Sequence, residues 1–375
     1  TELLHKYGFD RIKASDIIDN YNFEDRKLVE IVKATYFDPK IVVIDETTTA
    51  LSQEGREELY KHMNRIRESG NTVIFISHDL PEILDKSDTI TILRDGVYID
   101  TVKSADVTED DLKRLMVGRE VTGDYYRADY GEKVSDEVVL SVKDVTVPGL
   151  IEDVSFDLHK GEILGFGGLS ESGMHEIGKA IFGASYDRTG KVVLADGTEI
   201  NDIPTAIKHS IAYTSKDRDN ESVVLNQSIG DNICLPSLDE LAGKTHMLSD
   251  KKLKEFSNKF AKQMSVKMVN VDQFVSDLSG GNKQKVVLAR WIGKDSDIVV
   301  LDSPTRGIDI KVKQDIYQLM NQMRKNGKSI IMISEELMEL IGMCDRIVIM
   351  KDGKISGELE RSKQLDENSL ITMMV

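Results

Sequence analysis

The sequence has 375 residues, of which 40% are hydrophobic and 30% charged, and its formal net charge at pH 7 is −16. This length allows two domains, each with its own hydrophobic core, and the composition is that of an ordinary globular protein. The acidic balance argues against general nucleic-acid binding, which needs a basic surface, and no apolar run approaches the ~20 residues of a membrane-spanning helix.

Helices and apolar strands alternate through the first 117 residues. Residues 41–45 (IVVID) and 72–77 (TVIFIS) are runs rich in β-branched residues, which indicate strands of a parallel sheet covered on both faces. The pair Asp95 and Gly96 predicts a hairpin turn. Residues 118–137 are charged, aperiodic and glycine-bearing, which is typical of a linker.

Residues 138–375 repeat the pattern of the first segment at a constant offset. IVVLD (298–302) matches IVVID (41–45), since 298 − 41 = 257, and residues 334–353 match residues 77–96, since 334 − 77 = 257. A constant offset without a gap indicates two copies of one fold. The alternation of strands and helices predicts an α/β layered domain for each copy.

The offset also predicts where the first copy begins. Val138 opens the second copy, so the first is expected to open near position 138 − 257 = −119. About 119 residues of the first copy, including its own glycine-rich loop, are therefore expected to precede residue 1. The chain is interpreted as a fragment, with a degenerate protein as the alternative.

A glycine-rich loop follows the third predicted strand of the second copy. Gly168 and Gly173 keep the glycine spacing of a phosphate-binding loop, G-x-x-x-x-G-K-[ST], but Met174 and His175 replace Lys and Ser/Thr. The backbone cradle can persist without these residues, whereas the point charge and the metal ligand cannot. The loop is expected either to remain as a strand–turn–helix elbow kept for folding or to hold nucleotide without turnover. The candidate hydroxyl donors to a phosphate are Ser170 and Ser172.

The nonapeptide Leu278–Val286 (LSGGNKQKV) places two glycines at the start of a predicted helix. Glycines let a ligand approach the backbone, and a helix N-terminus offers unpaired N–H groups and the positive end of its dipole to a phosphate. Asp302 ends the next apolar strand, where a carboxylate can hold Mg²⁺. The residues expected to meet the phosphate are Ser279, Gly280, Gly281 and Asn282.

This nonapeptide and the IVVLD strand resemble the signature loop and Walker B strand of ATP-binding cassette (ABC) proteins. The resemblance covers essentially the whole chain and is to the tandem-cassette ATP-binding subunits of bacterial importers of the ribose/galactose type. It implies two tandem P-loop ATPase cassettes, each with a parallel-sheet core and a helical subdomain. Residues 1–117 would be the C-terminal part of the first, incomplete at its N-terminus, and residues 138–375 the second. The carrying segments are 116–120, 143–169, 215–236, 278–292 and 302–310.

The resemblance assigns catalytic roles in the first copy. Asp45 would hold Mg²⁺, Glu46 would orient or activate the attacking water, and His78 would hydrogen-bond the γ-phosphate. For His78, helix capping with Ser77 and Asp79 is the alternative. The second copy has Ser303 and Glu335 in place of Glu46 and His78, so its own nucleotide site is not expected to hydrolyse ATP.

ABC cassettes pair head to tail, so the signature loop of one half closes the phosphate site of the other. In the first copy Asn22–Glu24 stand where residues 279–281 stand in the second, and a carboxylate and a bulky ring there would repel or block a phosphate. The defects therefore fall in one composite site, whereas Asp45, Glu46, His78 and residues 279–281 fall in the other. Without the first glycine-rich loop, the 375-residue chain is expected to have little ATPase activity.

The resemblance implies a subunit at the cytoplasmic face of the cell membrane that uses ATP and Mg²⁺ to drive import of a sugar or nucleoside-like solute. It would act on two membrane permease subunits, with cargo delivered by a separate binding protein and no nucleic acid involved. The two distant cysteines, Cys234 and Cys344, suit a reducing cytoplasm. The alternatives are a regulatory pseudo-ATPase and a soluble tandem ABC translation factor, which would have a longer helical linker and two intact sites.

Overall fold

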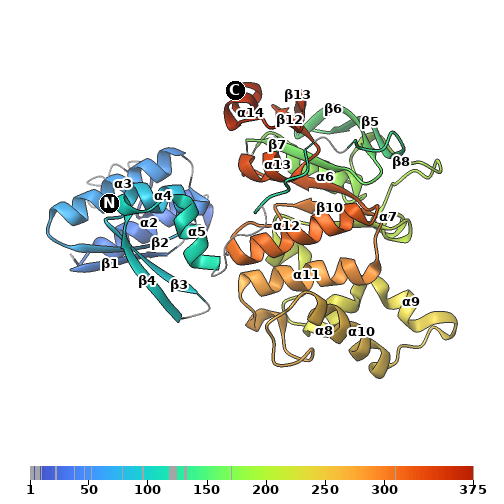
Figure 1. Ribbon diagram of the computed structural model, residues 1–375, viewed down its shortest axis with the longest axis horizontal. Coiled ribbons are helices and arrows are strands. Elements are labelled where there is room, and N and C mark those ends of the chain that lie inside the picture. Colours follow the sequence, from blue (N-terminus) through green and yellow to red (C-terminus); the bar gives the residue numbers. More distant parts are fainter. Residues whose placement is uncertain are drawn as a thin grey trace. The chain divides into compact units, whose positions relative to one another are not determined.

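The computed structural model describes residues 4, 9, 11–21, 23–37, 39–45, 47–51, 53–77, 79–94, 97–117, 125–130, 133–169, 171–308 and 310–374. The chain divides into two compact units, Thr1–Thr122 and Gly123–Val375, drawn from blue to cyan and from green to red in Figure 1. Within the described ranges, no helix combines the length and the apolar character that crossing a membrane requires.

The first unit alternates helices with strands. β1 and β2 pair in parallel, and β3 and β4 form an antiparallel hairpin. Asp79 caps α4 by accepting a hydrogen bond from the backbone N–H of Glu82, and Pro81 lies in the first turn, which together explain why the helix begins there. The elements in chain order are η1 (Ile18–Asn20), α2 (Phe23–Thr35), β1 (Ile41–Asp45), η2 (Thr47–Ala50), α3 (Gln53–Glu68), β2 (Thr72–Ile76), α4 (Leu80–Lys86), β3 (Thr89–Arg94), β4 (Val97–Lys103), η3 (Ser104–Asp106) and α5 (Glu109–Val117).

The second unit is built on a six-stranded sheet with the order β13-β12-β7-β11-β10-β9, in which only the β12–β13 pair is antiparallel. A separate antiparallel sheet has the order β6-β5-β8. The strands are β5 (Val138–Val147), β6 (Ile151–His159), β7 (Ile163–Gly168), β8 (Thr189–Leu194), β9 (Ile211–Thr214), β10 (Ile298–Asp302), β11 (Ser329–Ile333), β12 (Arg346–Lys351) and β13 (Lys354–Glu360).

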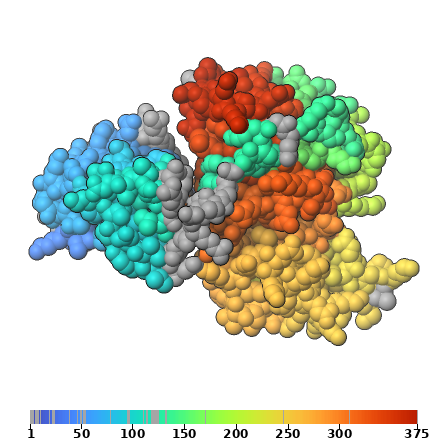
Figure 2. Space-filling model, in the orientation of Figure 1, coloured from blue at the N-terminus to red at the C-terminus, as the bar shows by residue number. Residues whose placement is uncertain are grey.

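Helices of the second unit pack on its sheet and also form a lobe of their own. α6 packs on β10 and β11, and α12 packs on β11, whereas α8, α10 and α11 pack on one another. Figure 2 shows this helical lobe in yellow, gold and light orange. The helices are α6 (Met174–Ile181), α7 (Ile203–Lys208), α8 (Ile229–Cys234), α9 (Leu238–Ala242), α10 (Asp250–Gln263), α11 (Gly280–Lys294), α12 (Ile310–Lys325), α13 (Leu337–Met343) and α14 (Glu367–Met374).

The offset found in the sequence recurs in the strand boundaries. β1 begins at Ile41 and β10 at Ile298, and 298 − 41 = 257. The same difference separates β2 from β11, β3 from β12 and β4 from β13 at both ends of each strand. The α/β layering and the helical lobe expected from the resemblance are therefore present, with the layers most complete in the second unit.

One expectation is wrong for the first unit: its strands are not covered on both faces. Ile41 and Val43 of β1 are 58% and 57% exposed, whereas Val42 and Ile44 between them are buried. In the second unit α6 covers the corresponding face. Its Gly178 lies so close to the sheet that a Cβ built there would be 3.4 Å from the Val300 side chain. Continuous β-branched runs therefore indicate a buried strand only where helices cover both faces of its sheet.

Part of the predicted linker is built into the second unit. Tyr125 and Tyr126 pack against its core, and Arg127 is 4% exposed. The Arg127 guanidinium donates to the Asp345 carboxylate at 2.7 Å and to the carbonyl oxygen of Met343 at 2.8 Å. The sequence did not predict this packing, because Met343 and Asp345, which bind Arg127, lie more than 200 positions away along the chain.

Candidate nucleotide site

Three parallel strands of the second unit end together at one edge of the sheet. β7, β11 and β10 are neighbours, and Asp302, the last residue of β10, pairs with Ile333, the last residue of β11. Ligands of open α/β sheets bind outside the carboxyl ends of such strands. This edge carries the glycine-rich loop after β7, the carboxylate of Asp302 and the residues that follow β11.

The loop from Gly168 to Gly173 joins β7 to α6, as its glycine spacing predicts. Gly173 has a φ of 88°, and a Cβ there would lie 2.6 Å from the carbonyl oxygen of Leu150, so the position requires glycine. The Ser172 side chain is buried, and its Oγ has no hydrogen-bond partner within the described part of the chain. The loop thus brings together three of its four predicted residues, and the fourth, Ser170, lies outside the described residues.

His175 stands where a phosphate-binding loop has Ser or Thr, in the first turn of α6. Its Nδ1 lies 2.7 Å from Oδ1 of Asp302, and the Ser303 hydroxyl lies 3.1 Å from the same oxygen. The Tyr213 hydroxyl lies 3.5 Å from Oδ2 of Asp302. Both oxygens of this carboxylate, on a residue that is only 1% exposed, therefore face protein groups.

A second ion pair adjoins this contact. Nζ of Lys216 lies 2.7 Å from Oε1 of Glu335 and 3.1 Å from Nε2 of His175. A proton on Nδ1 of His175 lets the ring donate to Asp302 and accept from Lys216, so one tautomer satisfies both contacts. Burial disfavours the charged ring, but the carboxylates of Asp302 and Glu335 outweigh burial and raise the pKa of His175. We call His175, Lys216, Asp302 and Glu335 the charged cluster.

The sequence pointed to only part of this arrangement. The sequence indicates that His175, Ser303 and Glu335 depart from an ABC site together, but it predicts neither their contacts nor the presence of Tyr213 and Lys216 beside them. The signal that could have found Tyr213 and Lys216 is their position at the end of a strand. β9 is a largely apolar run followed directly by polar residues, as β1 and β10 are. Because β9 neighbours β10 in the sheet, its end reaches the same edge.

The four residues of the signature loop lie together at the start of α11, as predicted. Ser279 is the N-cap residue, and Gly280 opens the helix. The Asn282 side chain donates to Oγ of Ser279 at 2.9 Å and accepts from the backbone N–H of Lys267 at 2.8 Å, so its amide fastens the loop. A Cβ at Gly280 would lie 3.2 Å from Nη2 of Arg218, which places a guanidinium beside this helix end. Gly281 continues the first turn.

Arg290 anchors α11 within the helical lobe. Arg290 is 6% exposed, and its guanidinium donates to the carbonyl oxygens of Asn232 and Ser222, at 2.6 Å each. A third bond of 3.0 Å goes to the Asn232 side chain. Burial lowers the pKa of Arg290 to about 10. The helix that presents the signature loop is therefore fixed to α8 from inside the lobe.

In the first unit, Asp45 ends β1 with an exposed side chain, whereas Glu46 and His78 lie outside the described residues. A buried carboxylate holds the segments on either side of them. Glu82 accepts hydrogen bonds from Thr48 at 3.0 Å, from Ser77 at 2.7 Å and from Tyr60. Thr48 and Ser77 lie within two residues of Glu46 and His78, so this carboxylate positions both segments.

The same arrangement recurs in the second unit at the same offset. Glu339 is 82 + 257, and it accepts hydrogen bonds from Ser334 at 2.8 Å, from Thr305 and from Tyr317. Glu339 is 1% exposed. Neither glutamate was predicted from the sequence. The matching spacing of Thr, Tyr, Ser and Glu in the two copies was the signal that could have found them.

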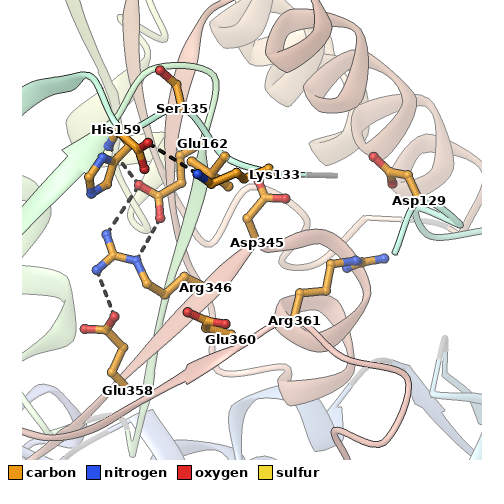
Figure 3. Close-up of a pocket in the computed structure, with 12 residues that line it drawn as sticks. Asp129, Lys133, Ser135, His159, Glu162, Asp345, Arg346, Glu358, Glu360 and Arg361 are labelled. Carbon is orange, nitrogen blue, oxygen red and sulfur yellow. Dashed lines mark hydrogen bonds and ion pairs between the residues drawn. The ribbon is translucent and has the colours of Figure 1, made fainter. Parts of the chain in front are cut away.

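A cavity of about 570 Å³ lies elsewhere on the second unit, lined by charged residues including Glu162, Arg346 and Glu358 (Figure 3). Figure 3 shows Arg346 between two carboxylates, with Nε 2.8 Å from Glu162 and Nη1 2.9 Å from Glu358. Glu162 and Arg346 mark the amino ends of β7 and β12, so this cavity is at the opposite end of the strands from the glycine-rich loop. Its charges stabilise one another and form a structural ion-pair network.

Comparison with known proteins identifies the class of protein to which this fold belongs. The ABC transporter family profile matches residues 151–306. A bacterial ABC transporter cassette solved as a dimer is 20% identical with a TM-score of 0.53, and covers 60% of this chain and 99% of its own. A nucleotide-free cassette gives 18% identity and a TM-score of 0.54, over 64% of this chain and 99% of its own. The fold is therefore that of an ABC cassette.

Relatives that align with almost the whole chain make the family assignment more specific. The ribose import ATP-binding protein RbsA of Lacticaseibacillus paracasei is 40% identical over 95% of this chain and 70% of the relative. The xylose import ATP-binding protein XylG of Thermoanaerobacter pseudethanolicus is 41% identical over 90% of this chain and 68% of the relative. The chain belongs to this family of ATP-binding subunits of ABC importers, and it spans about 70% of the length of the first relative.

Proposed function

We propose that the protein is the ATP-hydrolysing subunit of a sugar importer and that its productive site is a composite one. The observation that carries this is the set Ser279–Asn282 on the N-terminus of α11, in a chain 40% identical to a ribose import ATP-binding protein. The glycines expose backbone N–H groups, and the helix dipole favours the negative charge of a phosphate. These residues would bind the terminal phosphate of ATP held by the first copy.

The first copy would supply the hydrolytic groups. Asp45 fits a Mg²⁺ ligand because its carboxylate is exposed at the end of β1. Bound Mg²⁺ would neutralise charge on the phosphates. Glu46 would accept a proton from the attacking water, and His78 would hydrogen-bond the γ-phosphate. Glu82 would keep the segments around both residues in place through Thr48 and Ser77.

We further propose that the subunit binds the cytoplasmic face of the membrane through two permease subunits and receives cargo from a separate binding protein. ATP closing the two cassettes would move the permeases, and hydrolysis would let the cassettes reopen. The relatives are named as import proteins, which supports this role over that of a translation factor or a regulatory pseudo-ATPase. ATP and Mg²⁺ would be the cofactors, with no nucleic-acid partner.

Uptake in the native host tests the proposal. Replacing the chromosomal gene with the Glu46→Gln variant should lower uptake of labelled ribose or xylose at least about 100-fold, because loss of a general base costs roughly 10²–10⁴ in rate. Glu57→Gln, an exposed acid on α3, is the matched control and should leave uptake unchanged. Unchanged uptake of every pentose and hexose tested in the Glu46→Gln strain would refute the proposal.

A further inference from the structure

We infer that the nucleotide site of the second cassette takes no divalent cation, because the imidazole of His175 and the ammonium of Lys216 permanently replace it. The inference rests on the proposed function only in treating the chain as an ABC ATPase, in whose second cassette the glycine-rich loop and Asp302 occupy the positions of a nucleotide site. It reverses the expectation from sequence that Asp302 binds Mg²⁺. Three observations carry it, and each concerns a different part of an ordinary Mg²⁺ site.

The first observation is the space between the two usual ligands. In a phosphate-binding loop, Mg²⁺ sits between the Ser/Thr hydroxyl and the Walker B carboxylate, at about 2.0–2.1 Å from each oxygen. The side chain of residue 175 and the carboxylate of Asp302 would then be separated by a cation. Instead, Nδ1 of His175 lies 2.7 Å from Oδ1 of Asp302. This direct hydrogen bond leaves no position for an ion.

The second observation is the state of the carboxylate itself. Asp302 is 1% exposed, and its oxygens also meet the Ser303 hydroxyl at 3.1 Å and the Tyr213 hydroxyl at 3.5 Å. Mg²⁺ demands near-octahedral geometry and usually keeps several waters. A carboxylate with so little exposure, whose Oδ1 already accepts from an imidazole and a hydroxyl, leaves little room for those waters. Within the described residues, no group of three or more His, Cys, Asp or Glu side chains is arranged to hold a metal ion.

The third observation is the positive charge of Lys216 beside the carboxylates. Lys216 brings an ammonium to within 2.7 Å of Glu335 and 3.1 Å of His175, next to the carboxylate that Mg²⁺ would otherwise neutralise. A buried carboxylate is costly unless it is paired and hydrogen-bonded, and the charged cluster provides both without a metal. Glu335 replaces the histidine of the first copy, so a second carboxylate is held here by a protein cation.

Manganese binding tests the inference on the complete 375-residue chain. Mn²⁺ prefers the same oxygen ligands as Mg²⁺ and is followed by EPR, alone and with ATP. Asp302→Asn should leave Mn²⁺ affinity unchanged, whereas loss of a metal ligand should lower it at least about tenfold. Asp45→Asn is the matched control at the equivalent position of the first copy. A weaker or lost Mn²⁺ site in the Asp302→Asn chain would overturn the inference.

The role of His175 has its own test. His175→Thr restores the residue type of a phosphate-binding loop and removes the ring from the carboxylate. This variant should gain a Mn²⁺ site that disappears in the double variant with Asp302→Asn, and Mn²⁺ should raise its Tm. His175→Asn retains an N–H near the position of Nδ1 and should gain none. If correctly folded His175→Thr also gains no site, His175 is not the group that stands in the ion's place.

Fluorescence of a trinitrophenyl ATP analogue, measured in parallel, separates the two proposals. Failure of the analogue to bind would count against the proposed nucleotide site, whereas the Mn²⁺ comparison between the unmodified and Asp302→Asn chains would still decide the question of the cation. That comparison does not depend on whether His175→Thr folds.

Discussion

Single buried side chains hold the loops of both units, and the two glutamates are the clearest case. Glu339 is enclosed by three hydroxyls, those of Thr305, Tyr317 and Ser334, and Glu82 has the same three partners at the corresponding positions. The arrangement persists in the second unit although Ser303 and Glu335 stand where the first unit has Glu46 and His78. Its role is therefore to position the loops, whichever residues the loops carry.

Glu339→Ala should destabilise the second unit strongly. Each buried hydroxyl left without an acceptor costs about 1–3 kcal/mol, so the loss of three should lower the free energy of unfolding by at least about 3 kcal/mol. Urea unfolding followed by the fluorescence of Trp291, the single tryptophan of the chain, measures this in the second unit. Glu255→Ala, on the exposed side of α10, is the control and should stay within about 0.5 kcal/mol. A comparable small effect at Glu339 would show that water satisfies the hydroxyls.

At the residue scale, the sequence predicted which residues form the two loops but not which side-chain atoms meet. The motif spacing placed Gly168, Gly173 and residues 279–282 correctly, because local backbone geometry determines a loop followed by a helix. It did not predict that His175 bonds Asp302 or that Lys216 reaches Glu335. Those contacts join residues 127 and 119 positions apart, and they depend on the order of strands in the sheet.

At the scale of elements, runs of apolar residues identified the strands and their parallel character, and the constant offset aligned the two copies. The order β13-β12-β7-β11-β10-β9 could not be read in this way, because neighbours in a parallel sheet are separated by crossovers of variable length. The packing of the segment 125–130 could not be read from the sequence either. Its charge and lack of periodicity indicated a linker, and the structure adds that Arg127 and Asp129 form ion pairs within the second unit.

The pH dependence of that segment can be predicted. The Asp129 carboxylate meets Nε of Arg127 at 3.0 Å and also pairs with Arg324. Burial opposes the charged form, but the two guanidinium groups outweigh it and lower the pKa of Asp129 to about 2. The unfolded carboxyl has a pKa of about 3.9, so the stabilisation is present above about pH 4 and is lost as pH falls toward the folded pKa.

Asp129→Asn should therefore lower the free energy of unfolding at pH 7, and the difference from the unmodified chain should shrink steadily between about pH 5 and pH 2. Urea unfolding at a series of pH values provides the measurement. Asp187→Asn, which removes an exposed acid in the loop between α6 and β8, is the control for a general effect of charge. A difference that stays constant with pH would mean that the Asp129 carboxylate contributes through shape and not through its charge.

For the molecule as a whole, the two units differ most in how completely their sheets are covered. Ile74 and Ile76 of the first unit are 47% and 45% exposed, whereas their counterparts Ile331 and Ile333 in the second unit are fully buried. Apolar surface left in water contributes nothing to folding and favours self-association. The repeated sequence therefore provides an internal control: the same substitution at equivalent positions should destabilise the second unit and leave the stability of the first nearly unchanged.

Val43 and Val300 provide that comparison, at 57% and 0% exposed. Val300→Thr buries a hydroxyl between α6 and the sheet and should lower the free energy of unfolding of the second unit by about 1–3 kcal/mol, measured by Trp291 fluorescence. Val43→Thr should change the stability of the first unit by no more than about 0.5 kcal/mol, measured by circular dichroism, and should reduce light scattering by the chain at high concentration. If Val43→Thr proved as destabilising as Val300→Thr, this face of β1 would be covered in solution. Replacing a methyl group by a hydroxyl lowers the free energy of unfolding by this much only where the side chain is buried.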